Sequence, residues 1–453
     1  MHNAIKDEKF NFTVLFLKCS DQRKHCFSRY NLDIINYTGD QVDEGISFGL
    51  KSVFKKVIEY DYFKNYFDKG IYKTNSEIIN IVKTETPHYV IWLPRDFILE
   101  ETLSYIKKTG SFIVGYFSDD QTRFETQTIY WLPYIDYAVT IDNIKSIDKY
   151  RGYGVDAIFS PSGVSTQIFR KNFLNYKYDV SFIGLKYSDR EEIVNSMINS
   201  GIRVNVFGSG WDSGRVSRST MIDIFNSSKI NLNFVKGYDC NCDQIKGRIF
   251  EVLACGGFLI TEYVEGLEKF YDLDKEIVSY KSIPEAVSKI KYYLDHEDER
   301  LRIAEAGMKR TLENYTWENH LRSVFKLIEN KNIKKNDLPP LFLPKYMKKE
   351  RALLHEKMAY IFASEYDNDI WFDELKIAHC SHKLIRLKYL VLKINKYLPS
   401  HFVKQIFILL CYFDNFFLGI ISFFKKNVIK LVCLQIFEKS YDKLSQFNKK
   451  VKK

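Results

Sequence analysis

The chain has 453 residues, of which 45% are hydrophobic and 27% charged, a balance that excludes an intrinsically disordered protein and allows two domains with an extension. Its net charge of +10 is unevenly placed, because residues 331–453 hold 24 Lys or Arg against 11 Asp or Glu, whereas the first 330 residues hold 43 against 46. The main body therefore lacks the basic excess of a nucleic-acid-binding protein. Eight cysteines, without a secretory leader pattern, indicate reduced thiols and a cytoplasmic protein.

The first 160 residues alternate strand-like runs with helix-like segments. Apolar runs rich in β-branched and aromatic residues predict strands at 12–18, 32–37, 88–93, 111–117, 136–141 and 156–161. Helices are predicted between them at 76–85, 98–108 and 143–154. Strands that alternate with helices are typical of a parallel sheet covered by helices on both faces.

The same alternation restarts near residue 178. Strands are predicted at 178–184, 203–210, 229–235, 256–262 and 276–280. Three helices follow, the first with Pro284 in its first turn and the last after Thr316 as its N-cap. The predicted fold class is therefore α/β, with two doubly wound parallel-sheet domains in tandem. Such sheets bind ligands in a crevice outside the carboxyl ends of their strands.

The segment KGRIFEVLACGGFLITEY, residues 246–263, carries the clearest functional signal. It predicts a helix that follows a loop, ends on two glycines and leads into the next strand, so that the helix N-terminus points toward the crevice. Free N–H groups attract phosphate there, and Lys246 and Arg248 add positive charge. Glu251, within a turn of the same point, can accept hydrogen bonds from vicinal sugar hydroxyls. Cations for a pyrophosphate beside a carboxylate for a ribose predict a nucleotide diphosphate sugar site.

Residues 178–328 resemble the donor domain of GT-B glycosyltransferases, and most closely the CgeB-like (spore-maturation type) group-1 transferases. The resemblance is carried in order by DVSFIG (179–184), FGSGW (207–211), SKINLNF (228–234), residues 246–271 and residues 304–321. The N-terminal half matches more loosely, through 115–121 and 153–169. The resemblance implies the GT-B fold. The domains that we expect are an acceptor-side domain, a nucleotide-sugar donor domain and a basic, aromatic-rich helical tail, at 1–165, 166–335 and 336–453.

Retaining GT-B transferases often carry a Glu-x7-Glu motif, whose second Glu binds the ribose and whose first approaches the donor sugar. Glu251 matches the second position, and Asp243 stands in place of the first, where a role in a loop turn is an equal alternative. The family places cations after its first Gly-ended strand, commonly an Arg directly after the Gly, but here the cations are Lys186 and Arg190. The donor-binding residues that we expect are Lys186, Arg190, Gly208, Lys246, Gly247, Arg248, Glu251, Gly256 and Gly257.

Structural roles compete with several of these assignments. Arg248 could neutralise Glu251 at i+3 on the same helix. Gly256 and Gly257 have a structural explanation as C-cap and close-packing positions, and we expect them to serve both purposes. Asp119 and Asp120 follow the strand predicted at 111–117. They are candidates for orienting the acceptor hydroxyl or acting as a base, with an N-cap for the next helix as an equal alternative.

No metal and no cofactor are predicted, because the helix end and its cations can offset the charge of a departing diphosphate. The Asp-x-Asp pattern at 272–274 follows a helix instead of a nucleotide-binding strand, which indicates surface charge. The Cys and His pairs at 240–242 and 379–382 lack a second matching ligand pair for zinc.

Residues 383–453 hold 15 Lys or Arg against 3 Asp or Glu. Their apolar stretch at 402–424 is interrupted by Lys404 and Asp414, which is unfavourable for a transmembrane span. Basic helices with large aromatic faces bind at the surface of anionic membranes. We therefore expect this tail to contact the membrane peripherally, with a helical hairpin packed on the body or a dimer contact as the alternative.

Together these observations predict a cytoplasmic glycosyltransferase, peripheral on the inner face of the membrane. It would move a sugar from a nucleotide diphosphate donor to a glycan, lipid-linked or protein acceptor, with retention of configuration. A nucleotide-sugar epimerase of the same fold is one alternative. A non-catalytic coat or scaffold protein that keeps a sugar-nucleotide pocket is another, which the intact Lys246, Arg248 and Glu251 argue against.

Overall fold

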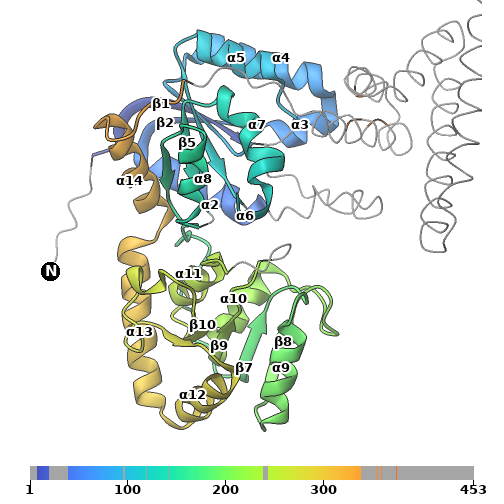
Figure 1. Ribbon diagram of the computed structural model, residues 1–453, viewed down its shortest axis with the longest axis vertical. Coiled ribbons are helices and arrows are strands. Elements are labelled where there is room, and N and C mark those ends of the chain that lie inside the picture. The colour runs from blue at the N-terminus through green and yellow to red at the C-terminus, as the bar shows by residue number, and fades with distance from the viewer. Residues whose placement is uncertain are drawn as a thin grey trace, which may run out of the picture. The chain divides into compact units, whose positions relative to one another are not determined.

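The computed structural model describes residues 8–337, apart from 20–38, 95–96, 119, 142 and 238–242, together with His355, Ala359 and Glu374. The chain divides into two compact units, residues 1–342 and 343–453. Both sheets lie in the first unit (Figure 1). The predicted tail segment 383–453 lies outside the described residues. Within the described part of the chain, no helix combines the length and the apolarity needed to cross a membrane.

Within the described residues, the first sheet has six parallel strands in the order β2-β1-β3-β4-β5-β6. These are β1 (Phe10–Lys18), β2 (Phe54–Asp61), β3 (Tyr89–Trp92), β4 (Phe112–Phe117), β5 (Tyr137–Thr140) and β6 (Ala157–Phe159). Five of the predicted strands coincide with β1, β3, β4, β5 and β6, and the sixth, at 32–37, lies outside the described residues. Sequence analysis did not predict β2, whose sequence FKKVIEYD is only partly buried because it forms the edge of the sheet.

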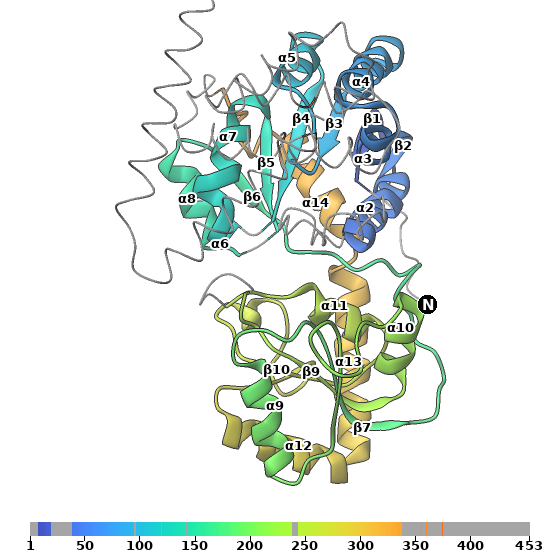
Figure 2. The ribbon, with the colours of Figure 1, turned by 90° about the vertical axis from the view of Figure 1, so that its right-hand side faces the viewer.

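Helices cover this sheet. They are α2 (Gly39–Val53), α3 (Tyr62–Lys69), α4 (Ile71–Glu85), α5 (Glu100–Lys108), α6 (Asp120–Arg123), α7 (Ile129–Trp131) and α8 (Ser146–Gly152). A further helix, α14 (Trp317–Glu329), follows the second sheet in the sequence but packs beside α2 on the first sheet (Figure 2). The apolar face of α14, which includes Leu321 and Phe325, is buried in the core of the first sheet.

The second sheet has five parallel strands in the order β11-β10-β9-β7-β8. These are β7 (Tyr178–Ile183), β8 (Val204–Phe207), β9 (Ser228–Asn233), β10 (Leu259–Glu262) and β11 (Val278–Tyr280), one for each predicted strand. One face packs against α10 (Arg218–Asn226) and α11 (Gly247–Ala254). The other packs against α9 (Arg190–Asn199), α12 (Ile283–Asp295) and α13 (Glu297–Asn314). The predicted plan of two doubly wound parallel sheets is confirmed.

The strand order of the second sheet fixes where a ligand can enter. After β7 the chain moves outward to β8, and it then returns to the other side of β7 to form β9. The helices that leave β7 and β9 therefore lie on opposite faces of the sheet and diverge at the carboxyl ends of these strands. In doubly wound sheets this reversal point is where ligands bind.

Candidate functional site

A cavity of about 330 Å³, here called the β7–β9 cavity, lies at this reversal point. The ends of β7 and β9 contribute residues 182–185 and Asn233. The start of α11 contributes Lys246, Gly247, Arg248 and Glu251. The rest of the wall comes from the segment that precedes β7, from Tyr187 and Arg190, and from Trp317. Sequence analysis had placed the site at this edge of the sheet, and five of its nine donor-binding candidates line the cavity.

The helix α11 presents its polar residues to the cavity because of its 3.6-residue period. Its apolar residues Ile249, Phe250, Val252 and Leu253 are almost fully buried against the sheet. The remaining face carries Arg248 and Glu251, one turn apart. Lys246 is the N-cap residue in an extended conformation, and its side chain makes no capping hydrogen bond. The positive end of the helix dipole therefore lies at the cavity wall.

Arg248 and Glu251 are in direct contact. The Nη1 atom of Arg248 lies 2.5 Å from Oε2 of Glu251, and the two side chains are 22% and 15% exposed. The guanidinium of Arg248 also packs over the ring of Phe225, 5.1 Å from its centroid, and contacts Met221. The neutralising pair that the sequence raised as an alternative role for Arg248 is thus present, and it holds both side chains against the cavity wall.

Arg190 is a buried cation in the same wall. Only 6% of its surface is exposed, and its Nη1 donates to the carbonyl oxygen of Leu185 at 2.9 Å. Its Nη2 donates to the hydroxyl of Tyr187 at 2.7 Å, and the Tyr187 ring stacks on the guanidinium at 3.9 Å. Its Nε atom has no hydrogen-bond partner among the described residues. Burial lowers the pKa of Arg190 from its ordinary value, but arginine stays charged, so Arg190 contributes a buried cation to the cavity wall.

Lys186 and Gly208 lie next to the cavity without lining it. The Nζ atom of Lys186 is 2.7 Å from Glu191 and 5.4 Å from the ring centroid of Trp211. Gly208 has a φ of +134°, and a Cβ atom there would lie 2.1 Å from the carbonyl oxygen of Gly184, which does line the cavity. Gly208 therefore supports the cavity floor through a close backbone contact.

Gly256 and Gly257 lie at the opposite end of α11 from the cavity. Gly256 has a φ of +70°, and its N–H donates to Leu253 at 2.9 Å, while the N–H of Gly257 donates to Val252 at 3.0 Å. These bonds terminate the helix in the manner that the sequence predicted. The structure does not bring the two glycines to the cavity, because the length of the helix separates them from it.

None of the three acidic candidates, Asp243, Asp119 and Asp120, is among the described residues that line the cavity. Asp243 is exposed, and its backbone oxygen accepts a hydrogen bond from Asn143. Asp119 lies outside the described residues. Asp120 is fully buried, and its carboxylate accepts hydrogen bonds from three hydroxyls, those of Thr128, Thr140 and Tyr150, at 2.7–2.8 Å. Burial raises the pKa of Asp120, and its contacts give it a structural role within the first sheet domain.

The segment that precedes β7 is a part of the site that sequence analysis missed. Val164 makes two backbone hydrogen bonds at the start of α14. It donates to Tyr315, two residues before the helix, at 2.9 Å and accepts from Trp317, the first residue of the helix, at 3.1 Å. A Cβ atom on Gly163 would lie 2.7 Å from the backbone nitrogen of Trp317. This tight pairing brings Trp317 into the cavity wall. The Ser-Pro-Ser-Gly sequence at 160–163 was the available signal of a turn beside the site.

His320 anchors the same segment and provides a prediction of pH dependence. Its Nδ1 lies 2.8 Å from the carbonyl oxygen of Pro161, and burial lowers its pKa from 6.5 to about 4. The folded state disfavours the protonated ring. The free energy of unfolding is therefore highest above about pH 6.5, and it decreases as the pH falls toward 4. We expect His320→Asn to remove up to roughly 3 kcal/mol of the wild-type pH dependence in this window. Urea unfolding of both proteins across the window measures this, and parallel pH profiles would contradict it.

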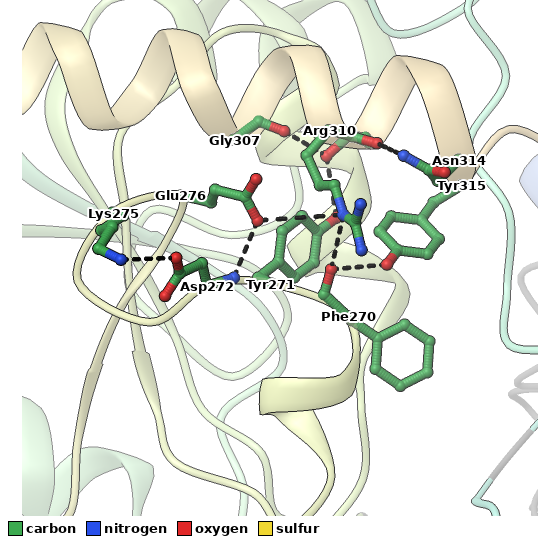
Figure 3. Close-up of polar contacts among 10 residues, drawn as sticks. Phe270, Tyr271, Asp272, Lys275, Glu276, Gly307, Arg310, Asn314 and Tyr315 are labelled. Atoms are coloured by element: carbon green, nitrogen blue, oxygen red, sulfur yellow. Dashed lines mark hydrogen bonds and ion pairs between the residues drawn. The ribbon is translucent and has the colours of Figure 1, made fainter.

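A second cavity, of about 520 Å³, lies beside the Asp-x-Asp segment at 272–274. Figure 3 shows Asp272 directed toward Lys275, 2.9 Å away, and Arg310 directed toward Glu276 and the carbonyl oxygen of Phe270. Asp274 pairs with Lys289 at 3.3 Å. Both aspartates are therefore compensated surface charges, as predicted. Among the described residues, no group of three His, Cys, Asp or Glu side chains is arranged to hold a metal ion.

Comparison with known proteins extends this picture. Residues 190–326 match the family model described as glycosyl transferase-like. The match begins at Arg190, the buried arginine of the cavity, and ends in α14. Spore protein CgeB of Bacillus subtilis (strain 168) is 20% identical over 297 residues, which cover 57% of this chain and 92% of CgeB. The chain resembles the CgeB-like group-1 glycosyltransferases. The predicted resemblance is confirmed, and seven of the residues that line the β7–β9 cavity, among them Arg190, Arg248 and Glu251, lie within the matched range.

Two solved structures are also similar to this chain. A glycosyltransferase from Rickettsia africae ESF-5 is 14% identical, with a TM-score of 0.45, and the match covers 71% of this chain and 98% of that one. Anabaena Alr3699/HepE, in complex with UDP-glucose, is 7% identical, with a TM-score of 0.47, over 71% of this chain and 100% of that one. The two doubly wound sheets and the glycosyltransferase-like second domain correspond to the GT-B fold expected from the sequence.

Proposed function

We propose that the chain transfers a sugar from a nucleotide diphosphate sugar to a glycan, lipid-linked or protein acceptor. One observation carries the proposal: the cations Arg190, Lys246 and Arg248, the N-terminus of α11 and the carboxylate of Glu251 all line a single cavity. This cavity lies at the reversal point of a doubly wound sheet, and these charged residues fall within the range that matches the glycosyl transferase-like family model. A diphosphate needs the cations and the free N–H groups, and a ribose needs the carboxylate.

The residues divide these tasks by their position. Glu251, one turn into α11, would accept hydrogen bonds from the ribose hydroxyls. The diphosphate would bind at the start of the helix, where Gly247 places no side chain between the phosphates and the backbone, with Arg190 and Lys246 on either side. Arg248 holds Glu251 in place and is available to a phosphate oxygen. Lys186 would reach the diphosphate by leaving Glu191, with which it pairs at a largely exposed site.

The same cations support a reaction without a metal ion. The charge on a departing nucleoside diphosphate would be stabilised by Arg190, Lys246 and the helix dipole, which are preorganised in a partly enclosed cavity. Asp243 matches the family's first motif carboxylate by sequence position alone, and retention of configuration is part of the proposal. The acceptor would bind from the side of the first sheet domain. Peripheral membrane contact through 383–453 belongs to the proposal as well, and that segment lies outside the described residues.

A panel of nucleotide sugars tests the proposal on the full chain. We expect thermal stabilisation by donors of one nucleobase family, together with slow hydrolysis of the matching donor, because binding to the folded state alone raises its stability. Stabilisation and hydrolysis should both persist in EDTA. No response to any donor would favour the scaffold alternative, and interconversion of the sugar without its release would favour the epimerase. Loss of turnover in EDTA that manganese or magnesium restores would contradict the metal-free mechanism alone.

A further inference from the structure

We propose that the loop formed by residues 170–177, here called the 170–177 loop, docks onto the surface of an anionic lipid bilayer. The loop immediately precedes β7 and has the sequence RKNFLNYK. It lies at the amino edge of the second sheet, so it is separate from the β7–β9 cavity at the carboxyl edge. The proposal concerns a different surface from the donor site and from the tail at 383–453, and it does not depend on the proposed sugar transfer.

The tip of the loop exposes large apolar side chains to solvent. Phe173 is 93% exposed, and Leu174 and Tyr176 are each 41% exposed. Isolated exposed apolar residues are common on proteins, but three within four positions of one loop form a patch that indicates a binding surface. Phe and Tyr are suited to the membrane interface, where an apolar ring is buried among headgroups and a polar tip stays in water.

Uncompensated positive charge surrounds this tip. Arg170, Lys171 and Lys177 are exposed, and none of them forms an ion pair within the described part of the chain. The sequence contains no Asp or Glu from 157 to 178. The ammonium of Lys171 lies 5.7 Å from the centroid of the Phe173 ring, so cation and aromatic ring are presented together. Each such cation near an anionic membrane surface contributes about 1 kcal/mol of attraction.

Hydrogen bonds hold the base of the loop, so its tip is presented to solvent instead of collapsing onto the domain. The side chain of Asn226 accepts from the N–H of Asn172 at 2.6 Å and donates to the carbonyl oxygen of Arg170 at 3.2 Å. At the other end, the N–H of Lys177 donates to Ser227 at 2.7 Å. A Cβ atom on Gly256 would meet the Lys171 stem at 3.0 Å, so this glycine also allows the loop to pack against the end of α11.

A cavity of about 260 Å³ beneath the tip continues the basic surface into the domain. Phe173, Leu174 and Tyr176 form part of its wall, and the almost fully buried Arg300 forms another part. Arg300 donates to the carbonyl oxygen of Tyr293 at 2.7 Å and lies 3.6 Å from Glu297. The cavity leaves room for the tip side chains to reorient as they enter a bilayer.

Charge favours a bilayer over a second copy of the chain as the occupant. In a symmetric dimer through this loop, Arg170, Lys171 and Lys177 would face their own copies, and like charges across an interface are unfavourable. An anionic bilayer instead offers negative charge for the cations and an apolar layer for the tip in the same contact.

A tryptophan at the tip reports on the loop directly, whatever the rest of the full chain does. We expect the emission of a Phe173→Trp variant to shift to the blue with vesicles that contain phosphatidylglycerol and not with pure phosphatidylcholine. A quencher attached to the lipid acyl chains should reduce this emission. The wild-type spectrum is subtracted to remove the five native tryptophans. The matched control is Tyr72→Trp on α4, since Tyr72 is 43% exposed in the other sheet domain.

Two further variants measure the energetics by vesicle sedimentation. Phe173→Ser should lower partitioning onto anionic vesicles by about tenfold, because it removes the aromatic ring that would be buried in the bilayer. Lys171→Glu should lower partitioning onto anionic vesicles by at least about fivefold. The difference from the wild type should be smaller in high salt. Neither change should alter the binding of a nucleotide sugar, so failure here is distinct from failure of the proposed function.

Three outcomes would overturn the inference. The first is vesicle binding that leaves the emission of the Phe173→Trp variant unchanged, which would assign the contact to another face of the protein. The second is no vesicle binding at all. The third is a blue shift that grows with protein concentration in the absence of lipid, which would make the loop a contact between copies.

Discussion

Replacing Glu251 with alanine should lower the affinity for a nucleotide diphosphate sugar by at least tenfold and leave the fold intact. Glu251 lines the β7–β9 cavity with a side chain that is 15% exposed, so hydrogen bonds that it accepts from a ribose would be largely shielded from water. Hydrogen bonds to a charged group contribute about 1.5–3 kcal/mol, which corresponds to a tenfold or greater change in affinity. Isothermal calorimetry on the full chain measures the loss.

The ion pair between Arg248 and Glu251 makes a matched set of variants necessary. Glu251→Ala leaves Arg248 without its partner, and part of any effect could arise from this cation. Glu251→Gln keeps the shape of the side chain, Arg248→Met keeps much of its apolar contact with Phe225, and the double variant completes a cycle. If Glu251 serves only to neutralise Arg248, the Glu251→Ala loss should disappear in the Arg248→Met background. A loss that persists assigns Glu251 to the ligand.

The part of the site on α11 was predictable because its determinants are local. The apolar period of α11 fixes which face packs on the sheet, and this places Arg248 and Glu251 on the other face. Glycines at its end predict where it stops. The assignment of Gly256 to the donor site did not take the length of the helix into account, since eight residues rise about 12 Å from one end to the other.

Other parts of the site depend on contacts that local sequence does not encode. Asp120 follows a strand, as a catalytic carboxylate often does, but the hydroxyls that surround it come from residues 128, 140 and 150. Trp317 enters the cavity wall because α14 returns to the first sheet after the second is complete. Neither arrangement has a spacing or a periodicity that sequence analysis could have recognised.

The edge strand β2 shows the same limit for the fold. The central strands were predicted from continuous apolar runs because a parallel strand with helices on both faces is buried on both sides. Among the described strands, Phe54–Asp61 has a neighbour on one side only, and Lys55 and Lys56 remain exposed. Its composition therefore resembles that of a surface segment, and only its pairing with β1 identifies it as a strand.

Gly208→Ala should destabilise the chain more than any other glycine change near the site, by about 3 kcal/mol or more. Two effects add at this position. Its φ of +134° is one that residues with a side chain rarely adopt, and the new Cβ would lie 2.1 Å from the carbonyl oxygen of Gly184 and 2.7 Å from its carbon. Backbone cannot move aside as a flexible side chain can, so either β7 or the loop after β8 must shift.

The change should also weaken donor binding, because Gly184 lines the β7–β9 cavity. Gly214→Ala is the matched control, since Gly214 lies in the same loop and its oxygen accepts the N–H of Gly208 at 2.8 Å. Gly214 has a φ of +63° and nothing within 4 Å of a new Cβ, so Gly214→Ala measures the cost of an ordinary left-handed φ without a collision, about 1–2 kcal/mol. Urea unfolding of the two variants, followed by donor titration of the folded proteins, measures how much the φ of +134° and the collision together add at Gly208. Equal losses of unfolding free energy would show that the contact with Gly184 relaxes without cost, and the cavity floor would then not depend on Gly208.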